Sequence, residues 1–159
     1  MICAGGNVWP VCGSIWGSPV NTLVFGRRYV YVYQVQFDLP SFNVRFGMLI
    51  KNLVGVGLGG QVTHSSGEGI EFIDEGRTLV IKFPFRNRLT PSTYFANAGV
   101  LGTIDGEEKY IHRIEDACMF RVAPDPGLLI TEMVDLSDSE ASITIETVRS
   151  EPPFCENDE

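Results

Sequence analysis

The sequence predicts an all-β fold: an immunoglobulin-like antiparallel β-sandwich built by a single domain, with helix limited to a turn or two. In several stretches, apolar residues recur at every second position, which is the period of a strand with one buried face. These stretches follow one another at spacings of about 10 to 20 residues and are separated by turn residues, as in a sandwich. A chain of 159 residues with 44% hydrophobic residues is long enough to enclose one core.

The N-terminal residues 1–26 are rich in glycine and proline, and we expect irregular approach strands there. Trp9 and Trp16 lie in this stretch. Each could stack on a sugar ring, or pack in the core or at a sheet edge, which is the more common role of tryptophan. The clearest strand runs from Arg28 to Asp38. One face of it is predicted to enter the core through the following side chains: Tyr29, Tyr31, Tyr33, Val35 and Phe37.

A hairpin over residues 44–63 is the segment around which we expect the other strands to be arranged. Phe46, Met48 and Ile50 alternate with other residues in its first strand, which indicates one buried face. A turn around Gly55 leads into a second strand that contains three glycines. Glycines in a strand bend it or let another group approach its backbone.

Two further strands are predicted, one at residues 77–86 and one that follows a corner at Leu89–Tyr94 and continues to about Gly102. Pro84 cannot donate a ladder hydrogen bond, so the end of the first of these strands should be an edge or a bulge. Tyr94 resembles the tyrosine corner of immunoglobulin-like sandwiches, in which the phenol bonds a backbone group just upstream. We therefore expect Tyr94 to have a structural role.

The last regular part of the body follows a turn at Asp105–Gly106. Residues 107–109 are charged, and we expect them to form a loop in water. The chain then runs from Tyr110 to Val122 and returns to the core. The adjacent carboxylates of Glu115 and Asp116 suggest an acid–base pair or a cation site. Neighbouring side chains on an extended strand point opposite ways, which argues against that interpretation.

The chain divides into three parts by composition: a body at 1–123, a C-terminal strand extension at 124–148 and an acidic tail at 149–159 that we expect to be disordered. The body has 11 basic and 10 acidic residues, whereas the remainder has 1 basic and 10 acidic ones. The tail therefore offers no patch that could neutralise phosphates, and we predict no binding of nucleic acid.

The hairpin and the strands after it carry a family resemblance. The pattern Phe46-Gly47-x-x-Ile50-x-Asn52-x-x-Gly55, followed by Gly60 and Thr63, resembles the carbohydrate-binding C-terminal domain of Wzt-type proteins, the ATP-binding subunits of ABC transporters that export O-antigen polysaccharide. The resemblance spans about residues 20–123 and includes these further elements: Gly76, Leu89-x-Pro91-x-x-Tyr94, Glu115-Asp116-Ala117 and Phe120-x-Val122.

The resemblance implies a function and a location. It implies recognition of an O-antigen polysaccharide on the cytoplasmic side of the inner membrane. The partners would be the ATP-binding domain of the parent protein and a membrane subunit. The ATP-binding domain is not in this chain, because the Walker pattern is absent from the sequence.

A candidate binding face follows from the alternation. If the strands at 44–52, 94–102 and 118–123 share a sheet, one face carries an apolar floor, planar polar groups and two glycines that lower the surface, which suits a carbohydrate. The predicted carbohydrate-binding residues on this face are Arg45, Gly47, Leu49, Phe95, Asn97, Gly99, Leu101, Met119 and Arg121. Lys51 belongs to the same face. The alternative is that a second subunit covers it, which makes the chain an immunoglobulin-like structural or dimerisation module without a ligand.

Catalysis and metal binding lack a motif. No serine lies in a nucleophile elbow, and His64 and His112 stand apart with no paired ligand spacing, so we predict no enzymatic activity, no metal and no cofactor. The four cysteines Cys3, Cys12, Cys118 and Cys155 form no Cys-x-x-Cys pair. We interpret them as reduced thiols, although an even count also permits disulfides in an exported protein.

The segment from Leu128 to Leu136 is predicted to be a strand that pairs across a homodimer. Pro124 and Pro126 stiffen the hinge before it, and a stiff hinge favours exchange of a terminal element. Exchange also follows from the resemblance to Wzt-type domains. A second strand-like stretch lies at Ile143–Val148.

Overall fold

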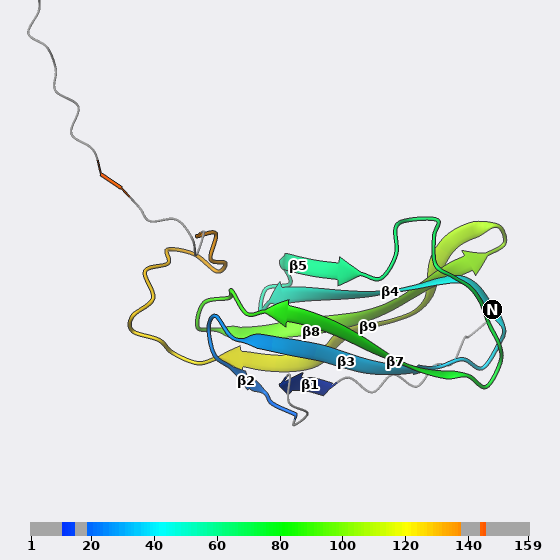
Figure 1. The fold of residues 1–159 in the computed structure, drawn as a ribbon, viewed down its shortest axis with the longest axis horizontal. Coiled ribbons are helices and arrows are strands. Elements are labelled where there is room, and N and C mark those ends of the chain that lie inside the picture. Colours follow the sequence, from blue (N-terminus) through cyan, green and yellow to red (C-terminus); the bar gives the residue numbers. More distant parts are fainter. Residues whose placement is uncertain (1–10, 15–18, 138–143, 146–159) are drawn as a thin grey trace, which may run out of the picture.

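The described residues form nine strands and no helix, so the all-β prediction is confirmed (Figure 1). A computed structural model describes residues 11–14, 19–137 and 144–145, and only the backbone of 11–14. The strands are β1 Val11–Ser14, β2 Thr22–Leu23, β3 Arg28–Gln36, β4 Ser41–Asn52, β5 Gly57–Val62, β6 Ile70–Ile73, β7 Thr78–Arg86, β8 Thr93–Ile104 and β9 Glu107–Val122. Within the described ranges, no helix is long and apolar enough to cross a membrane.

The strands form two sheets that lie one over the other (Figure 1). The smaller sheet has the order β1-β3-β7. The larger has the order β2-β9-β8-β4-β5, and β6 pairs with the first part of β4. Neighbouring strands are antiparallel except β2, which runs parallel to β9. The strands predicted at 44–52, 94–102 and 118–123 therefore share one sheet, in the order β9-β8-β4.

The core lies between the sheets and is rich in aromatic side chains. Tyr31 and Tyr33 of β3 are fully buried, as the alternation predicts. The Tyr33 ring stacks on Phe83 of β7 with 6.0 Å between the ring centroids, which adds a ring–ring contact to the area that both residues bury. The Tyr94 hydroxyl donates to the Thr90 carbonyl over 2.9 Å, which confirms the predicted tyrosine corner.

Tyr33 also connects the two sheets. Its hydroxyl lies 3.0 Å from the Gly47 carbonyl of β4 and 3.0 Å from the Gly99 carbonyl of β8. Burial raises the pKa of Tyr33 far above its ordinary value, because the phenolate would be desolvated, and this effect outweighs the two hydrogen bonds to the glycine carbonyls. The phenol is therefore a neutral donor that fixes two neighbouring strands of the larger sheet from the opposite side of the core.

The hairpin of β8 and β9 is longer than the alternation predicts. Residues 107–109, predicted to be a loop, belong to β9, and Thr103 and Ile104 extend β8. The hairpin turns at Asp105 and Gly106, whose φ angles of 54° and 79° fit a tight two-residue turn. A loop was predicted because these residues are charged. An exposed strand tolerates such side chains, so their polarity did not reveal the strand.

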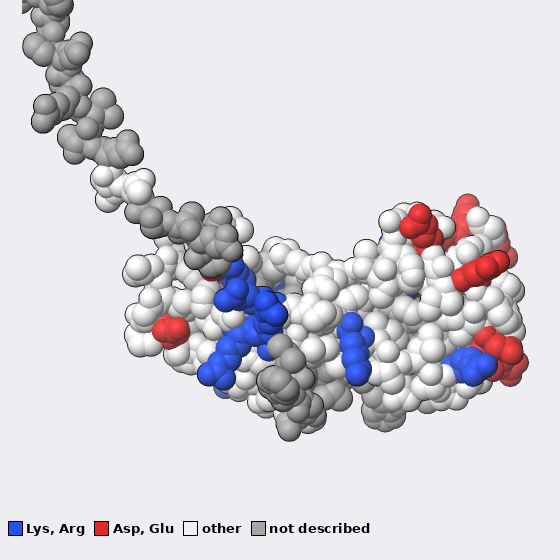
Figure 2. Space-filling view, in the orientation of Figure 1, with Lys and Arg blue, Asp and Glu red and all other residues white. Residues whose placement is uncertain are grey.

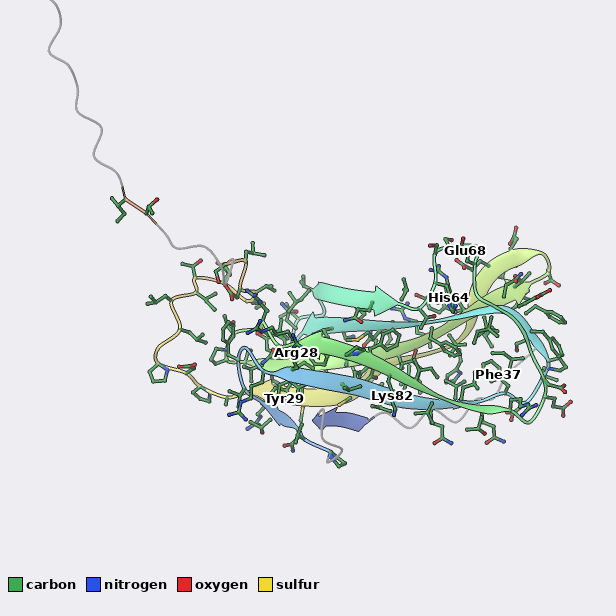
Figure 3. All side chains as sticks on the ribbon, in the orientation of Figure 1. Arg28, Tyr29, Phe37, His64, Glu68 and Lys82 are labelled. Atoms are coloured by element: carbon green, nitrogen blue, oxygen red, sulfur yellow. The ribbon has the colours of Figure 1, made fainter. Side chains whose placement is uncertain are left out.

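Charged side chains separate along the long axis on the face shown in Figure 2. Lys and Arg gather toward the end where β3 begins, and Asp and Glu gather toward the other end. Arg28 and Arg86 contribute to the basic end, because they are directly opposite each other across β3 and β7 and both are exposed. In Figure 3, Arg28 and Tyr29 mark this end, and Phe37 lies beyond the far end of β3.

The segment from Leu128 to Leu136, predicted to be a strand that pairs across a homodimer, is not a strand within this single chain, and its pairing with a second copy stays a prediction. Its only ladder contact in the described chain is a bridge between Val134 and Leu89 of the same chain. Asp135 donates its N–H to the Arg88 carbonyl over 2.8 Å, and the Arg88 guanidinium bonds the Asp135 carboxylate over 3.0 Å. A turn at Asp125–Leu128 redirects the chain, and Leu129 and Leu136 are almost fully exposed, so the apolar residues do not share a buried face.

Several predictions lie outside the described residues and stay predictions. They concern Trp9, Trp16, Cys3 and Cys155, most of the strand-like stretch at Ile143–Val148 and the acidic tail at 149–159.

Candidate functional site

A groove of about 160 Å³ lies on the outer face of the larger sheet, where β5, β4, β8 and β9 run side by side. Side chains from all four strands line it. Its lining residues are Arg45, Gly47, Met48, Leu49, Val62, Asn97, Gly99, Leu101, Tyr110 and Arg113.

The groove contains six of the nine predicted carbohydrate-binding residues. They are Arg45, Gly47, Leu49, Asn97, Gly99 and Leu101. The other three do not line it: Phe95 is opposite Met119, and Arg121 is opposite Thr93, closer to the end of the same sheet. The alternation thus placed these six residues on one face of the sheet, and the register of the ladder decides which of them meet in the groove.

Two glycines form the floor of the groove. Gly47 of β4 and Gly99 of β8 are directly opposite each other in the ladder. A Cβ atom at Gly47 would meet only the Val62 side chain at 3.5 Å and the Gln61 carbonyl at 3.7 Å, which are ordinary contacts. The fold therefore has room for a larger side chain at Gly47, and the groove exists partly because none is there.

Tyr110 and Arg113 line the groove but were not among the predicted site residues. Both come from β9, where Tyr110 is opposite Leu101 and Arg113 is opposite Gly99. The Arg113 guanidinium carbon lies 5.3 Å from the centroid of the Tyr110 ring. Strict alternation would send residues three positions apart to opposite faces of the sheet, so the sequence pattern predicted Tyr110 and Arg113 on different faces. An aromatic residue close to an arginine was the only available signal.

Asn97 holds the sheet together as well as lining the groove. Its side chain is buried, and its Oδ1 accepts the N–H of Asp116 over 2.9 Å. Asp116 has a φ of 54° and lies in a bulge where residues 115–117 are opposite a single position of β8. The amide oxygen of Asn97, a predicted carbohydrate-binding residue, is thus engaged within the protein.

Three cations of this face, Arg45, Arg113 and Lys51, are paired with carboxylates from β9. The Arg45 guanidinium makes a two-pronged bond to Glu108, with Nε–Oε1 and Nη2–Oε2 distances of 2.7 and 2.6 Å. Arg113 bonds Glu115 over 3.0 Å. Lys51 lies 3.0 Å from Asp116 and 3.9 Å from Glu115.

The contact of Lys51 with both carboxylates corrects the argument that Glu115 and Asp116 point opposite ways. That argument assumed a regular strand, and the bulge turns both side chains toward the lysine. The positive charges of Arg45, Arg113 and Lys51 are therefore balanced by carboxylates of β9.

Glu108 holds Arg45, which lines the groove, and also the loop that follows β5. Besides the two bonds from Arg45, its carboxylate accepts bonds from the Ser66 hydroxyl over 3.1 Å and the Gly67 N–H over 3.3 Å. The hydrogen bonds from Arg45 hold the pKa of Glu108 below its ordinary value, with a smaller contribution from Gly67. The loop that carries His64 and Glu68 is thereby held beside the β8–β9 hairpin (Figure 3).

A second hollow, of about 180 Å³, lies between β5 and β7 at the open side of the two sheets. Core side chains line it together with Leu89 and Val134, so it is a gap at the edge of the core. It contains none of the predicted site residues, and we do not treat it as the candidate site. Among residues 11–14, 19–137 and 144–145, no group of three or more His, Cys, Asp or Glu residues could hold a metal ion.

The fold and the groove define an all-β domain with an open, charge-balanced surface on its larger sheet. Residues 15–136 match the family model of the Wzt C-terminal domain, and the chain belongs to this family. A crystal structure of the C-terminal domain of wzt has the same fold, with a TM-score of 0.70 and 21% sequence identity over 87% of this chain and 89% of that chain. No curated protein matches the sequence.

Proposed function

We propose that this chain is a non-catalytic module that recognises a specific O-antigen polysaccharide. The observation that carries the proposal is the groove over Gly47 and Gly99, which collects six residues predicted from the sequence to bind carbohydrate, in a member of the Wzt C-terminal domain family. Apolar side chains around a recessed floor suit the C–H faces of sugar rings, and a few planar polar groups suit their hydroxyls.

The charge balance of the groove favours an uncharged glycan. Arg45 and Arg113 line the groove, but Glu108 and Glu115 pair with them, so a neutral ligand leaves no charge uncompensated. Sugar hydroxyls exchange bonds to water for bonds to protein with little net gain. We therefore expect modest affinity for each groove.

The proposal places the chain in an export system. As part of a Wzt-type protein, it would act on the cytoplasmic side of the inner membrane, together with the ATP-binding domain of the parent protein and a membrane subunit. Recognition of the polymer would be coupled to its export. Within this proposal, the two-sheet body is an immunoglobulin-like sandwich, which the Tyr94–Thr90 corner bond supports.

A blocked groove tests the proposal. Gly47→Leu directs a side chain into the groove from a position where the fold has room for it, whereas Gly59→Leu makes the same substitution on β5 away from the groove. Titration calorimetry with the cognate O-polysaccharide should show binding by the wild type and Gly59→Leu, and loss of binding by Gly47→Leu. Absence of wild-type binding, or equal binding of an unrelated polysaccharide, would remove specific recognition.

We further propose that the chain forms a homodimer in which the C-terminal segment is exchanged. No regular ladder holds this segment to its own body within the described residues. Its contacts are the bridge of Val134 to Leu89 with the packing of Val134 on the core, two backbone bonds, the bonds of Arg88 to Asp135 and Ser137, and a bond of Asn52 to Met133. The same contacts can be made between two copies, which would place two grooves on one assembly and raise avidity for a polymer.

Light scattering tests the dimer. Truncation after Asp125 should abolish the dimer, whereas truncation after Val148 should preserve it. A monomeric full-length chain at micromolar concentration would contradict the exchange. If the chain is only a dimerisation module, Phe95→Ala and Asn97→Ala should change the oligomeric state and leave glycan retention unaltered.

A further inference from the structure

Tyr110 and Arg113 reach the same face because β9 contains a second bulge. Val100 is opposite His112 and Leu101 is opposite Tyr110, which leaves Ile111 without a partner position on β8. The extra residue shifts the alternation by one, so two side chains that are three positions apart both line the groove.

The bulge depends on a glycine of the neighbouring strand. Ile111 is partly buried and packs against the core, on the inner side of the larger sheet. A Cβ atom at Gly102 would lie 2.5 Å from the Ile111 Cδ1 atom and 3.0 Å from the Phe42 carbonyl oxygen. A side chain at Gly102 would therefore displace Ile111 or the backbone of β4.

The Tyr110 ring extends over the groove floor. Its Cε1 atom would be 3.3 Å from a Cβ atom at Gly99, so the edge of the ring lies over that glycine. Arg113 covers part of the ring, yet 54% of Tyr110 remains exposed. The other four tyrosines, at positions 29, 31, 33 and 94, are all buried. An exposed aromatic ring beside an apolar, recessed floor is a surface on which a sugar ring can stack.

We propose that Tyr110 is the residue on which a neutral pyranose ring of the polysaccharide stacks, and that Gly102 and the bulge at Ile111 position it. The inference rests on the proposed function and adds a ligand contact and a positioning residue to it. The ligand class is a sugar with contiguous C–H groups on one face, because such a face contacts an aromatic ring without losing hydrogen bonds. Arg113 uses one of its nitrogens for Glu115 and keeps other donors for the sugar hydroxyls.

Saturation-transfer NMR isolates Tyr110. The protein is deuterated except at its tyrosine rings, whose protons are then saturated in the presence of the cognate O-polysaccharide. The four buried tyrosines cannot contact the polymer directly, so strong transfer to the C–H protons of one face of a sugar residue identifies Tyr110 as the contact. Tyr110→Phe, studied with protonated phenylalanine, should keep the affinity within about threefold, whereas Tyr110→Leu should weaken it roughly tenfold.

Gly102→Ala tests the positioning role. It should weaken binding and reduce the transfer from Tyr110, whereas Gly59→Ala, which has no atom within 4 Å of the new methyl group, should change neither. If Gly102→Ala does not fold, Tyr110→Leu still decides the contact, because Tyr110 is a surface residue.

The possible outcomes separate the two proposals. Binding by the wild type with loss of transfer and affinity in Tyr110→Leu supports both. Equal binding by the wild type and Tyr110→Leu overturns the role of Tyr110, while the Gly47→Leu result still decides whether the groove binds glycan. Absence of wild-type binding to the cognate polymer overturns the proposed function together with the inference.

Discussion

Replacing Tyr33 with phenylalanine removes the hydroxyl through which that side chain bonds the larger sheet. The ring keeps its stacking on Phe83, because phenylalanine has nearly the same volume and shape. What is lost is the hydroxyl that lies 3.0 Å from both the Gly47 and Gly99 carbonyls. These two glycines form the groove floor, so the variant perturbs the floor from beneath without adding any atom to the groove.

The loss of stability in Tyr33→Phe can be estimated from the environment of the hydroxyl. Tyr33 is fully buried, so no water replaces the donor, and loss of a buried bond costs about 1–3 kcal/mol. A protein of this size loses about 2–4 °C of melting temperature for each kcal/mol, which gives a decrease of roughly 2–12 °C. Affinity for the polysaccharide should decrease as well, because the two strands are held less firmly at the groove.

The raised pKa of Tyr33 predicts how the stability difference between the wild type and Tyr33→Phe depends on pH. Burial raises the pKa in the folded chain, whereas the unfolded chain ionises near the ordinary value of about 10. Above about pH 10 the unfolded state loses this proton while the folded state keeps it, so the free energy of unfolding decreases as pH rises. The contribution of Tyr33 is therefore complete below pH 10 and is lost at higher pH.

Urea unfolding at pH 7 and at several values between about 9 and 11.5 measures both effects. The stability advantage of the wild type over Tyr33→Phe should be largest at neutral pH and should shrink above about pH 10, because the variant lacks the group that titrates. Two outcomes would show that the hydroxyl is not a buried neutral donor: equal free energies of unfolding of the two proteins at pH 7, or a difference between them that stays constant across the alkaline range.

Three further predictions concern other parts of the larger sheet. Gly60→Ala should destabilise the fold by about 1–3 kcal/mol, because the new Cβ would collide with a backbone carbonyl of β4, whereas Gly47→Ala should have little effect on thermal unfolding. Glu108→Gln should be less stable than the wild type above about pH 4.5. Because the pKa of Glu108 is lowered in the folded chain, the stability advantage of the wild type is lost as the pH falls through that pKa. The free energies of unfolding of the two proteins, measured at decreasing pH, should therefore become equal. Arg88→Ala should release the residues around Asp135, and limited proteolysis should cut them faster, because the guanidinium bonds both that carboxylate and the carbonyl of Ser137; an unchanged cleavage rate would refute this role.

The alternation of side chains made most of the body predictable. The period of two placed Tyr31, Tyr33, Met48 and Ile50 inside, and the order of the strands then brought Gly47 and Gly99 together on the opposite face. These inferences succeed because burial of one face is the main determinant of such a strand.

The parts that could not be predicted are those where local geometry departs from that period. The bulges at Ile111 and at residues 115–117 change which side chains share a face, and the residue types at these positions do not predict a bulge. The short parallel strand β2 is another case, because its two residues carry too little pattern to be recognised. The position of the segment after Pro124 on its own body could not be predicted either, because isolated contacts such as the bridge of Val134 to Leu89 fix it there, and no regular ladder does within the described chain.

The bulge at Ile111 has a consequence for how related chains can diverge. A substitution in β9 changes one side chain and leaves every other facing as before. Deletion of a single residue between Tyr110 and Arg113 would remove the bulge and leave the two side chains two positions apart, so both would still face the groove, whereas loss of the bulge without a change in length would turn one of them toward the core. The bulge thus compensates for one extra residue in β9, and chains of this family that differ there should be aligned by strand register before they are compared by residue identity.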